Sequence, residues 1–117
     1  MNVNIALVGI GYWGRNLLRV FDGLGGCTVS VICDADEATR SRLKQSHPET
    51  RVVASLDEIV TDDFVDGVVL AVPTESHAQC ATQVLESRKH CFVEKPMATS
   101  VAECNALISL ARRESVV

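Results

Sequence analysis

A glycine-rich segment near the start of the chain has the spacing of an anion-binding turn. Gly9, Gly11 and Gly14 form a G-x-G-x-x-G pattern at the end of an apolar run, Val3 to Gly9, that we predict to be a strand. Between a strand and a helix, this pattern is typical of a turn that binds a dinucleotide diphosphate. Gly9 would allow the tight turn, Gly11 would let the backbone approach the diphosphate, and Gly14 would let the helix pack closely on the sheet.

The start of the following helix would supply the binding groups. The backbone N–H groups of Gly11, Tyr12 and Trp13 have no partner inside a helix, and the helix N-terminus carries about half a positive charge. An anion can therefore bind there without a basic side chain. A phosphate-binding loop of the Gly-Lys-Ser/Thr type is excluded, because no such residues follow. A glycine turn that serves only packing is the alternative.

An acidic residue ends the second predicted strand, Cys27 to Asp34. Asp34 follows the glycine pattern by about twenty residues, the distance at which a carboxylate accepts hydrogen bonds from the adenosine ribose. It would repel a 2′-phosphate by about 4 kcal/mol per unit charge at 4 Å and a dielectric constant near 20. We therefore expect NAD rather than NADP. Either Asp34 or Asp36 could instead cap the next helix, and Asp36 is better placed for that role.

Apolar runs and helical stretches alternate along the chain, which predicts an α/β fold with a doubly wound parallel sheet, the Rossmann type. The inward face of the first helix would carry Trp13, Leu17, Leu18 and Phe21. The expected strands are Val3–Gly9, Cys27–Asp34, Arg51–Ala54, Val65–Val72 and His90–Val93, and the expected helices are Tyr12–Leu24, Asp36–Ser46, Leu56–Val60, Ser76–Arg88 and Ser100–Glu114.

The last residues, Ser115 to Val117, resemble the opening of a sixth strand. Six strands are usual for this fold, so we expect residues 1–117 to be the dinucleotide-binding domain of a larger protein, with the sixth strand truncated and a C-terminal substrate domain absent. A natural stand-alone domain is the alternative.

Composition excludes several other classes of protein. The net charge of −4 and the scattered basic residues argue against nucleic-acid binding. The five cysteines form no C-x-x-C pair, so neither a disulfide framework nor a metal site is expected. The first residues lack a signal-peptide pattern, and the apolar run beginning at Ile5 is too short to span a membrane. We expect a cytoplasmic protein.

Two segments in the second half add a family resemblance. One is Ala71-Val72-Pro73-Thr74-Glu75-Ser76-His77, which leaves the expected central strand at its carboxyl end. The other is Glu94-Lys95-Pro96, which follows the fifth strand. Together with the glycine turn these segments resemble the Gfo/Idh/MocA oxidoreductases over essentially the whole chain, and Glu-Lys-Pro is the most specific element of the resemblance.

The resemblance implies an NAD(P)-dependent dehydrogenase that acts on hydroxyl carbons of sugars or cyclitols, with wording nearest to members that act on nucleotide-linked sugars. By position, Lys95 corresponds to the motif lysine near the nicotinamide and the substrate hydroxyl, and Glu94 to the acid beside the nicotinamide ribose. Pro73, Thr74 and His77 match the segment that lines the cofactor. The resemblance also implies a cis Lys95-Pro96 bond, and homo-oligomers of the full-length protein.

Single residues in these segments also have structural interpretations. His77 could be an ordinary residue at a helix start, with Thr74 as the cap, and Lys95 could be a surface lysine. For the whole chain, an NAD-sensing module without chemistry and a fragment of an adenosylmethionine-dependent methyltransferase remain alternatives.

Overall fold

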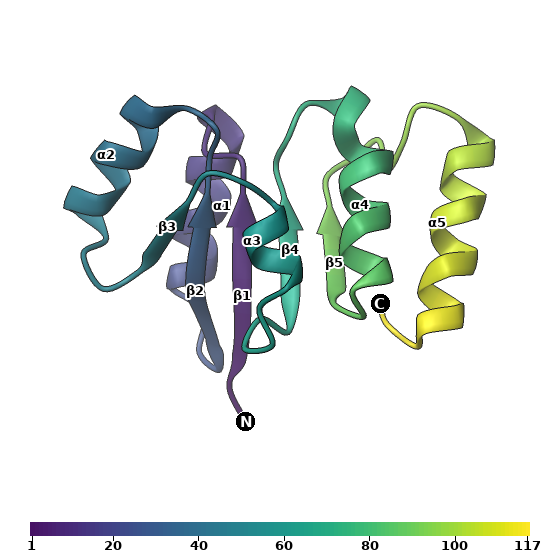
Figure 1. Cartoon of the computed structure of the whole chain (residues 1–117), viewed down its shortest axis with the longest axis horizontal. Helices are drawn as coiled ribbons and strands as arrows, with labels where there is room; N and C mark the ends of the chain where they lie inside the picture. The colour runs from purple at the N-terminus through teal and green to yellow at the C-terminus, as the bar shows by residue number, and fades with distance from the viewer.

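A parallel sheet of five strands forms the centre of the computed structural model, which describes residues 1–117 (Figure 1). The strand order is β3-β2-β1-β4-β5, and every neighbouring pair is parallel. All carboxyl ends therefore meet at one edge, the upper edge in Figure 1. The predicted α/β architecture is confirmed. The strands are β1 (Val3–Val8), β2 (Cys27–Cys33), β3 (Arg51–Val53), β4 (Gly67–Leu70) and β5 (His90–Val93).

Helices cover the sheet on both faces. Leu18 of α1 and Leu43 of α2 join the core on one face. Ile59 of α3 and Val84 of α4 join the core on the other, where α5 packs beside α4 (Figure 1). Burial on both faces explains why the strands read as continuous apolar runs. The helices are α1 (Tyr12–Asp22), α2 (Glu37–Ser46), α3 (Asp57–Val60), α4 (His77–Glu86) and α5 (Val101–Glu114), with a short 3₁₀ helix, η1 (Thr74–Ser76), before α4.

The ends of the helices follow side-chain caps. Asp36 accepts a hydrogen bond from the Thr39 amide at 2.9 Å, so it caps α2 as expected. Hydrogen bonds from Thr39 also hold the pKa of the Asp36 carboxyl below its usual value. Ser100 caps α5 in the same way through the Glu103 amide at 3.1 Å. With Asp36 as the cap, the carboxylate of Asp34 is not needed for that role.

One predicted core position is wrong. Trp13 was expected on the inward face of the first helix, but its side chain is 53% exposed. At this first turn Gly14 faces the sheet, because its backbone lies against Gly9. Leu18 is buried farther along α1, with Leu17 and Phe21 packed beside it as predicted. Trp13 is left over the carboxyl edge of the sheet.

The final residue of the chain lies beside the edge strand β5. The Cys91 amide donates to the Val117 carbonyl oxygen at 2.8 Å, and the Val117 amide donates to His90 Nδ1 at 3.1 Å. These residues were expected to open a sixth strand, but the sheet has five strands. None of the helices has both the length and the apolar character needed to cross a membrane.

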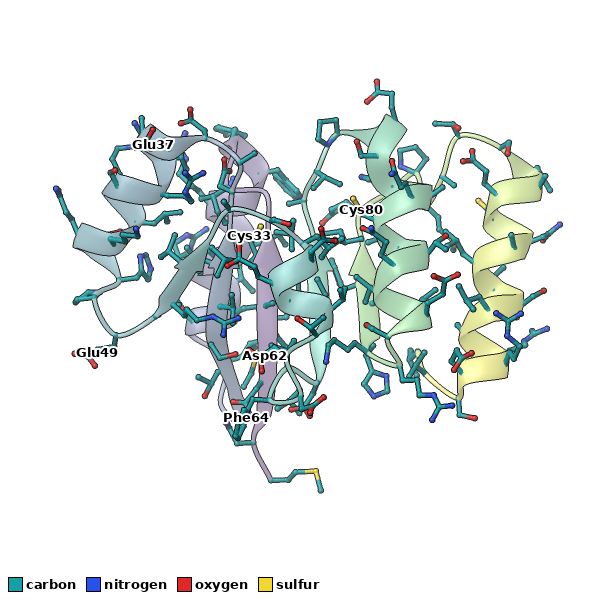
Figure 2. All side chains as sticks on the ribbon, viewed as in Figure 1. Cys33, Glu37, Glu49, Asp62, Phe64 and Cys80 are labelled. Atoms are coloured by element: carbon teal, nitrogen blue, oxygen red, sulfur yellow. The ribbon has the colours of Figure 1, made fainter.

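A buried lysine stabilises the opposite edge of the sheet. Lys89 Nζ donates to the carbonyl oxygens of Asp62 at 2.6 Å and Val65 at 3.0 Å. These hydrogen bonds compensate the burial of the lysine, which is 6% exposed. Asp62 and Phe64 lie at this lower end, near the N-terminus, whereas Cys33 lies toward the upper end of β2 (Figure 2).

Candidate cofactor-binding site

Each glycine of the turn has the environment that its predicted role requires. Gly9 has a φ of +91°, and a Cβ there would lie 2.6 Å from the Ala71 carbonyl oxygen. A Cβ on Gly14 would overlap the Gly9 carbonyl oxygen, so only glycine lets α1 approach the sheet this closely. A Cβ on Gly11 would meet no atom within 4 Å, so this position faces open space.

The amides at the start of α1 are available to a ligand. Gly11 caps the helix with extended backbone and no side-chain hydrogen bond. The N–H groups of Gly11, Tyr12 and Trp13 donate to no protein acceptor. They stand at the positive end of the helix dipole, beside the open space at Gly11. This geometry fits a diphosphate, which needs several donors and close backbone approach.

Asp34 is connected to the glycine turn by a direct hydrogen bond. Its Oδ2 accepts from the Ile10 amide at 2.8 Å, and its Oδ1 accepts from the Asp36 amide at 2.8 Å. The side chain is half-buried at the carboxyl end of β2. Each carboxylate oxygen can accept a second hydrogen bond, so two ribose hydroxyls could still bind. The hydrogen bond to Ile10 adds a supporting role that the sequence pattern did not show.

A cleft of about 590 Å³ joins these groups along the carboxyl edge of the sheet. Trp13 and Pro73 line it together with Gly11 and Asp34. Ala54 and Leu56 also line it, and the sequence analysis did not select them, although both follow β3 at the same edge. Ligands of open α/β sheets bind at this edge, so the cleft is the candidate cofactor site.

A neutral thiol forms part of the wall beside Asp34. Burial, and then the charge of Asp34, raises the pKa of Cys33 to about 11. The thiol therefore adds no negative charge to the cleft near pH 7. The carboxylate of Asp34 remains the acidic side chain that lines the cleft.

A larger cavity, of about 690 Å³, lies between α1 and α2. Arg15, Arg19 and Arg42 line it together with His47, which is 3.4 Å from the Asp22 carboxylate. The cavity meets the cleft at Gly11, but its walls are mainly the facing sides of two helices rather than strand ends. The smaller cleft is the stronger candidate for the cofactor site, because there the glycine turn and Asp34 line the same space.

The two segments that carry the family resemblance follow the neighbouring strands β4 and β5 at the carboxyl edge of the sheet. Pro73 lines the cleft, and Thr74 begins η1. In the alternative that made His77 a helix-start residue, His77 does begin α4, but Thr74 does not cap that helix. Glu94 is half-buried, and Lys95 is exposed without an ion pair. The Lys95-Pro96 bond is cis, as the resemblance implied.

His77 has a different environment from the one expected of a residue that touches the cofactor. It is 2% exposed, and its two ring nitrogens lie 2.7 Å from the Pro96 carbonyl oxygen and 3.0 Å from the Val72 carbonyl oxygen. The ring is therefore occupied by protein groups on both sides. The structure brings His77 near the site without leaving a ring nitrogen open to it.

Several known proteins contain a segment similar to this chain. An α-N-acetylgalactosaminidase of Shewanella oneidensis is 34% identical over 120 residues, which is 95% of this chain and 26% of that protein. GenD2 from gentamicin A biosynthesis, solved in complex with NAD, is 30% identical with a TM-score of 0.93, over 99% of this chain and 33% of that one. The chain thus spans about a quarter to a third of the length of these relatives.

The fold is shared even where the sequences have diverged. KijD10, a 3-ketoreductase from Actinomadura kijaniata solved with TDP-benzene and NADP, has a TM-score of 0.93 at 19% identity, over 100% of this chain and 37% of that one. Residues 3–117 match the family described as "Oxidoreductase family, NAD-binding Rossmann fold". This chain therefore belongs to the Gfo/Idh/MocA oxidoreductase family and forms its NAD-binding domain.

Proposed function

We propose that NAD binds along the cleft with its diphosphate over the amides of Gly11 to Trp13 and its adenosine ribose on Asp34. The nicotinamide end would then point toward Pro73 and Lys95. The observation that carries this placement is the combination of three unpaired amides, open space at Gly11 and a carboxylate on the same cleft. Thr74 and Glu94 would complete the nicotinamide end.

We further propose that the parent protein is a dehydrogenase acting on a sugar, a nucleotide-linked sugar or a cyclitol. NAD, when bound, would supply the hydride acceptor. Lys95 would hold or accept the proton of the substrate hydroxyl, since a nearby amine with a tunable pKa suits that task. Its exposed side chain, free of any ion pair, supports this role. The substrate pocket and the contacts between subunits would come from chain outside residues 1–117.

A second candidate function is glycoside hydrolysis by the full-length protein, because one relative at 34% identity is an α-N-acetylgalactosaminidase. The two activities leave different products. A dehydrogenase reduces NAD in the presence of a free sugar, whereas a glycosidase releases nitrophenol from a nitrophenyl α-N-acetylgalactosaminide. The NAD-sensing alternative predicts neither product, and the methyltransferase alternative does not agree with the family match.

Removing the charge of Asp34 should weaken the preference for NADH over NADPH. The wild-type chain should bind NADH at least tenfold more tightly than NADPH, because a 2′-phosphate would lie beside this carboxylate. Asp34→Asn should reduce that ratio at least tenfold, while its amide oxygen can still accept a hydrogen bond from Ile10. Trp13 is the only tryptophan and lines the cleft, so energy transfer from it to the reduced nicotinamide can report binding.

Asp63→Asn is the matched control, since Asp63 is exposed at the opposite edge of the sheet. It should leave both affinities unchanged. Equal affinities for NADH and NADPH in the wild type, or the same ratio in wild type and Asp34→Asn, would contradict the ribose role of Asp34.

A further inference from the structure

His77 contacts the two loops that follow the neighbouring strands β4 and β5. One ring nitrogen contacts the carbonyl oxygen of Pro96, in the turn that carries Lys95, and the other contacts the carbonyl oxygen of Val72, where the chain leaves β4. Carbonyl oxygens only accept, so each hydrogen bond needs a ring N–H. A neutral ring makes one of these bonds, and a protonated ring makes both. In either case the buried ring lies between the two loops and contacts both carbonyl oxygens.

The turn that follows β5 has little else to hold it. No backbone hydrogen bond is made by residues 94–98, and no other side-chain hydrogen bond or ion pair reaches them. Glu94 is half-buried, and Lys95, Pro96 and Met97 are exposed. Ala98, which is 7% exposed, is the apolar anchor at the far end of the turn. The hydrogen bond from His77 is thus the one polar link between the turn and the rest of the protein.

The partner on the other side is part of the cleft wall. Val72 lines the cleft next to Ala71, whose carbonyl oxygen lies close to Gly9. His77 therefore contacts both the turn that carries Lys95 and a residue of the cleft wall.

We propose that His77 is a positioning residue that holds the Glu94-Lys95-Pro96 turn, and with it the Lys95 ammonium, at the mouth of the cleft. This replaces direct contact with the cofactor, because the buried ring already has a protein acceptor at each nitrogen. The importance of positioning Lys95 rests on the proposed function of that residue. The claim that His77 holds the turn does not depend on that function, so the two claims can be tested separately.

The first test measures the order of the turn by ¹⁵N relaxation in the 117-residue chain. In the wild type, order parameters of the amides of Glu94, Lys95, Met97 and Ala98 should be near 0.85, and His77→Gln should lower them below about 0.6. Values in β1 and in the glycine turn should not change. His47→Gln is the matched control, because His47 pairs with Asp22 on the other side of the molecule. An unchanged turn, or equal loosening of the whole chain, would overturn the proposal.

The second test measures whether the effect passes through Lys95. Loss of one hydrogen bond should weaken NADH binding about fivefold in His77→Gln. Binding of ADP, which reaches only the glycine turn and Asp34, should change less than twofold. In a Lys95→Ala background, His77→Gln should change NADH binding less than twofold, as expected for two residues that act as a unit. A full fivefold loss in that background would contradict positioning of Lys95.

Two further outcomes keep the ideas apart. If the wild-type chain binds neither NADH nor ADP, the proposed cofactor site fails, and the relaxation result alone decides whether His77 holds the turn. If His77→Gln does not fold, the wild type still gives an answer. A ring N–H with a nuclear Overhauser contact to Pro96 or Met97 would support the bridge, and the absence of that contact would overturn it.

Discussion

Replacing Gly14 by alanine should lower the free energy of unfolding by more than about 3 kcal/mol, the upper range for overpacking a tight contact. The added Cβ would overlap the Gly9 carbonyl oxygen, which is backbone and has no freedom to rotate away. To remove this overlap, α1 would have to move away from the sheet. That movement would disturb the core on this face, to which Leu18 of α1 belongs. Urea denaturation followed by circular dichroism measures the change.

Gly25→Ala is the matched control for this substitution. A Cβ on Gly25 meets no atom within 4 Å, so this variant should stay within about 0.5 kcal/mol of the wild type. If Gly14→Ala and Gly25→Ala have the same denaturation midpoint, the close packing of α1 on the glycine turn is not as the structure describes.

Replacing Gly11 by valine should weaken NADH binding while the protein remains folded, in contrast to the loss of stability expected for Gly14→Ala. A Cβ at this position meets no protein atom within 4 Å, and the extended backbone at this helix cap accepts residues other than glycine. The cost in stability should be about 1 kcal/mol, because glycine is a better cap than valine. NADH affinity should fall by more than tenfold, since the side chain would occupy the space that the diphosphate needs.

Thermal unfolding and energy transfer from Trp13 measure the two quantities on the same sample. The proposal requires that substitution of Gly11 lowers NADH affinity with little loss of stability, whereas substitution of Gly14 lowers the stability of the protein. An NADH affinity within twofold of the wild type in Gly11→Val would show that the diphosphate does not approach this residue.

Features that depend on a few neighbouring residues were predictable from the sequence. The roles of Gly9 and Gly14 follow from a strand that turns directly into a helix, and the environments of both residues confirm them. The cap at Asp36 depends on the Thr39 amide only three residues away. The parallel sheet follows from strands with burial on both faces, as at Ala6 and Leu7, which are both fully buried.

Features that depend on residues far apart in the chain were not predictable. Helical periodicity predicted that Trp13 lies in the core, but its side chain is exposed. The periodicity shows which face of α1 is apolar and does not show where along the helix the sheet ends. The hydrogen bond between Asp34 and Ile10 spans 24 residues, and the one between His77 and Pro96 spans 19. Sequence alone gave His77 a cofactor role or a helix-start role. His77 does begin α4, and the structure adds a contact that neither role includes, with two loops that meet only in the folded chain.

The most direct test of the central claim is to record amide chemical shifts of the 117-residue chain during a titration with NADH. The largest changes should occur at Gly11, Tyr12 and Trp13, because their unpaired N–H groups would donate to the diphosphate. Smaller changes should follow at Asp34 and Lys95. If the changes instead cluster at Arg19 and Arg42 in the cavity between α1 and α2 and the glycine turn is unaffected, NADH does not bind as proposed.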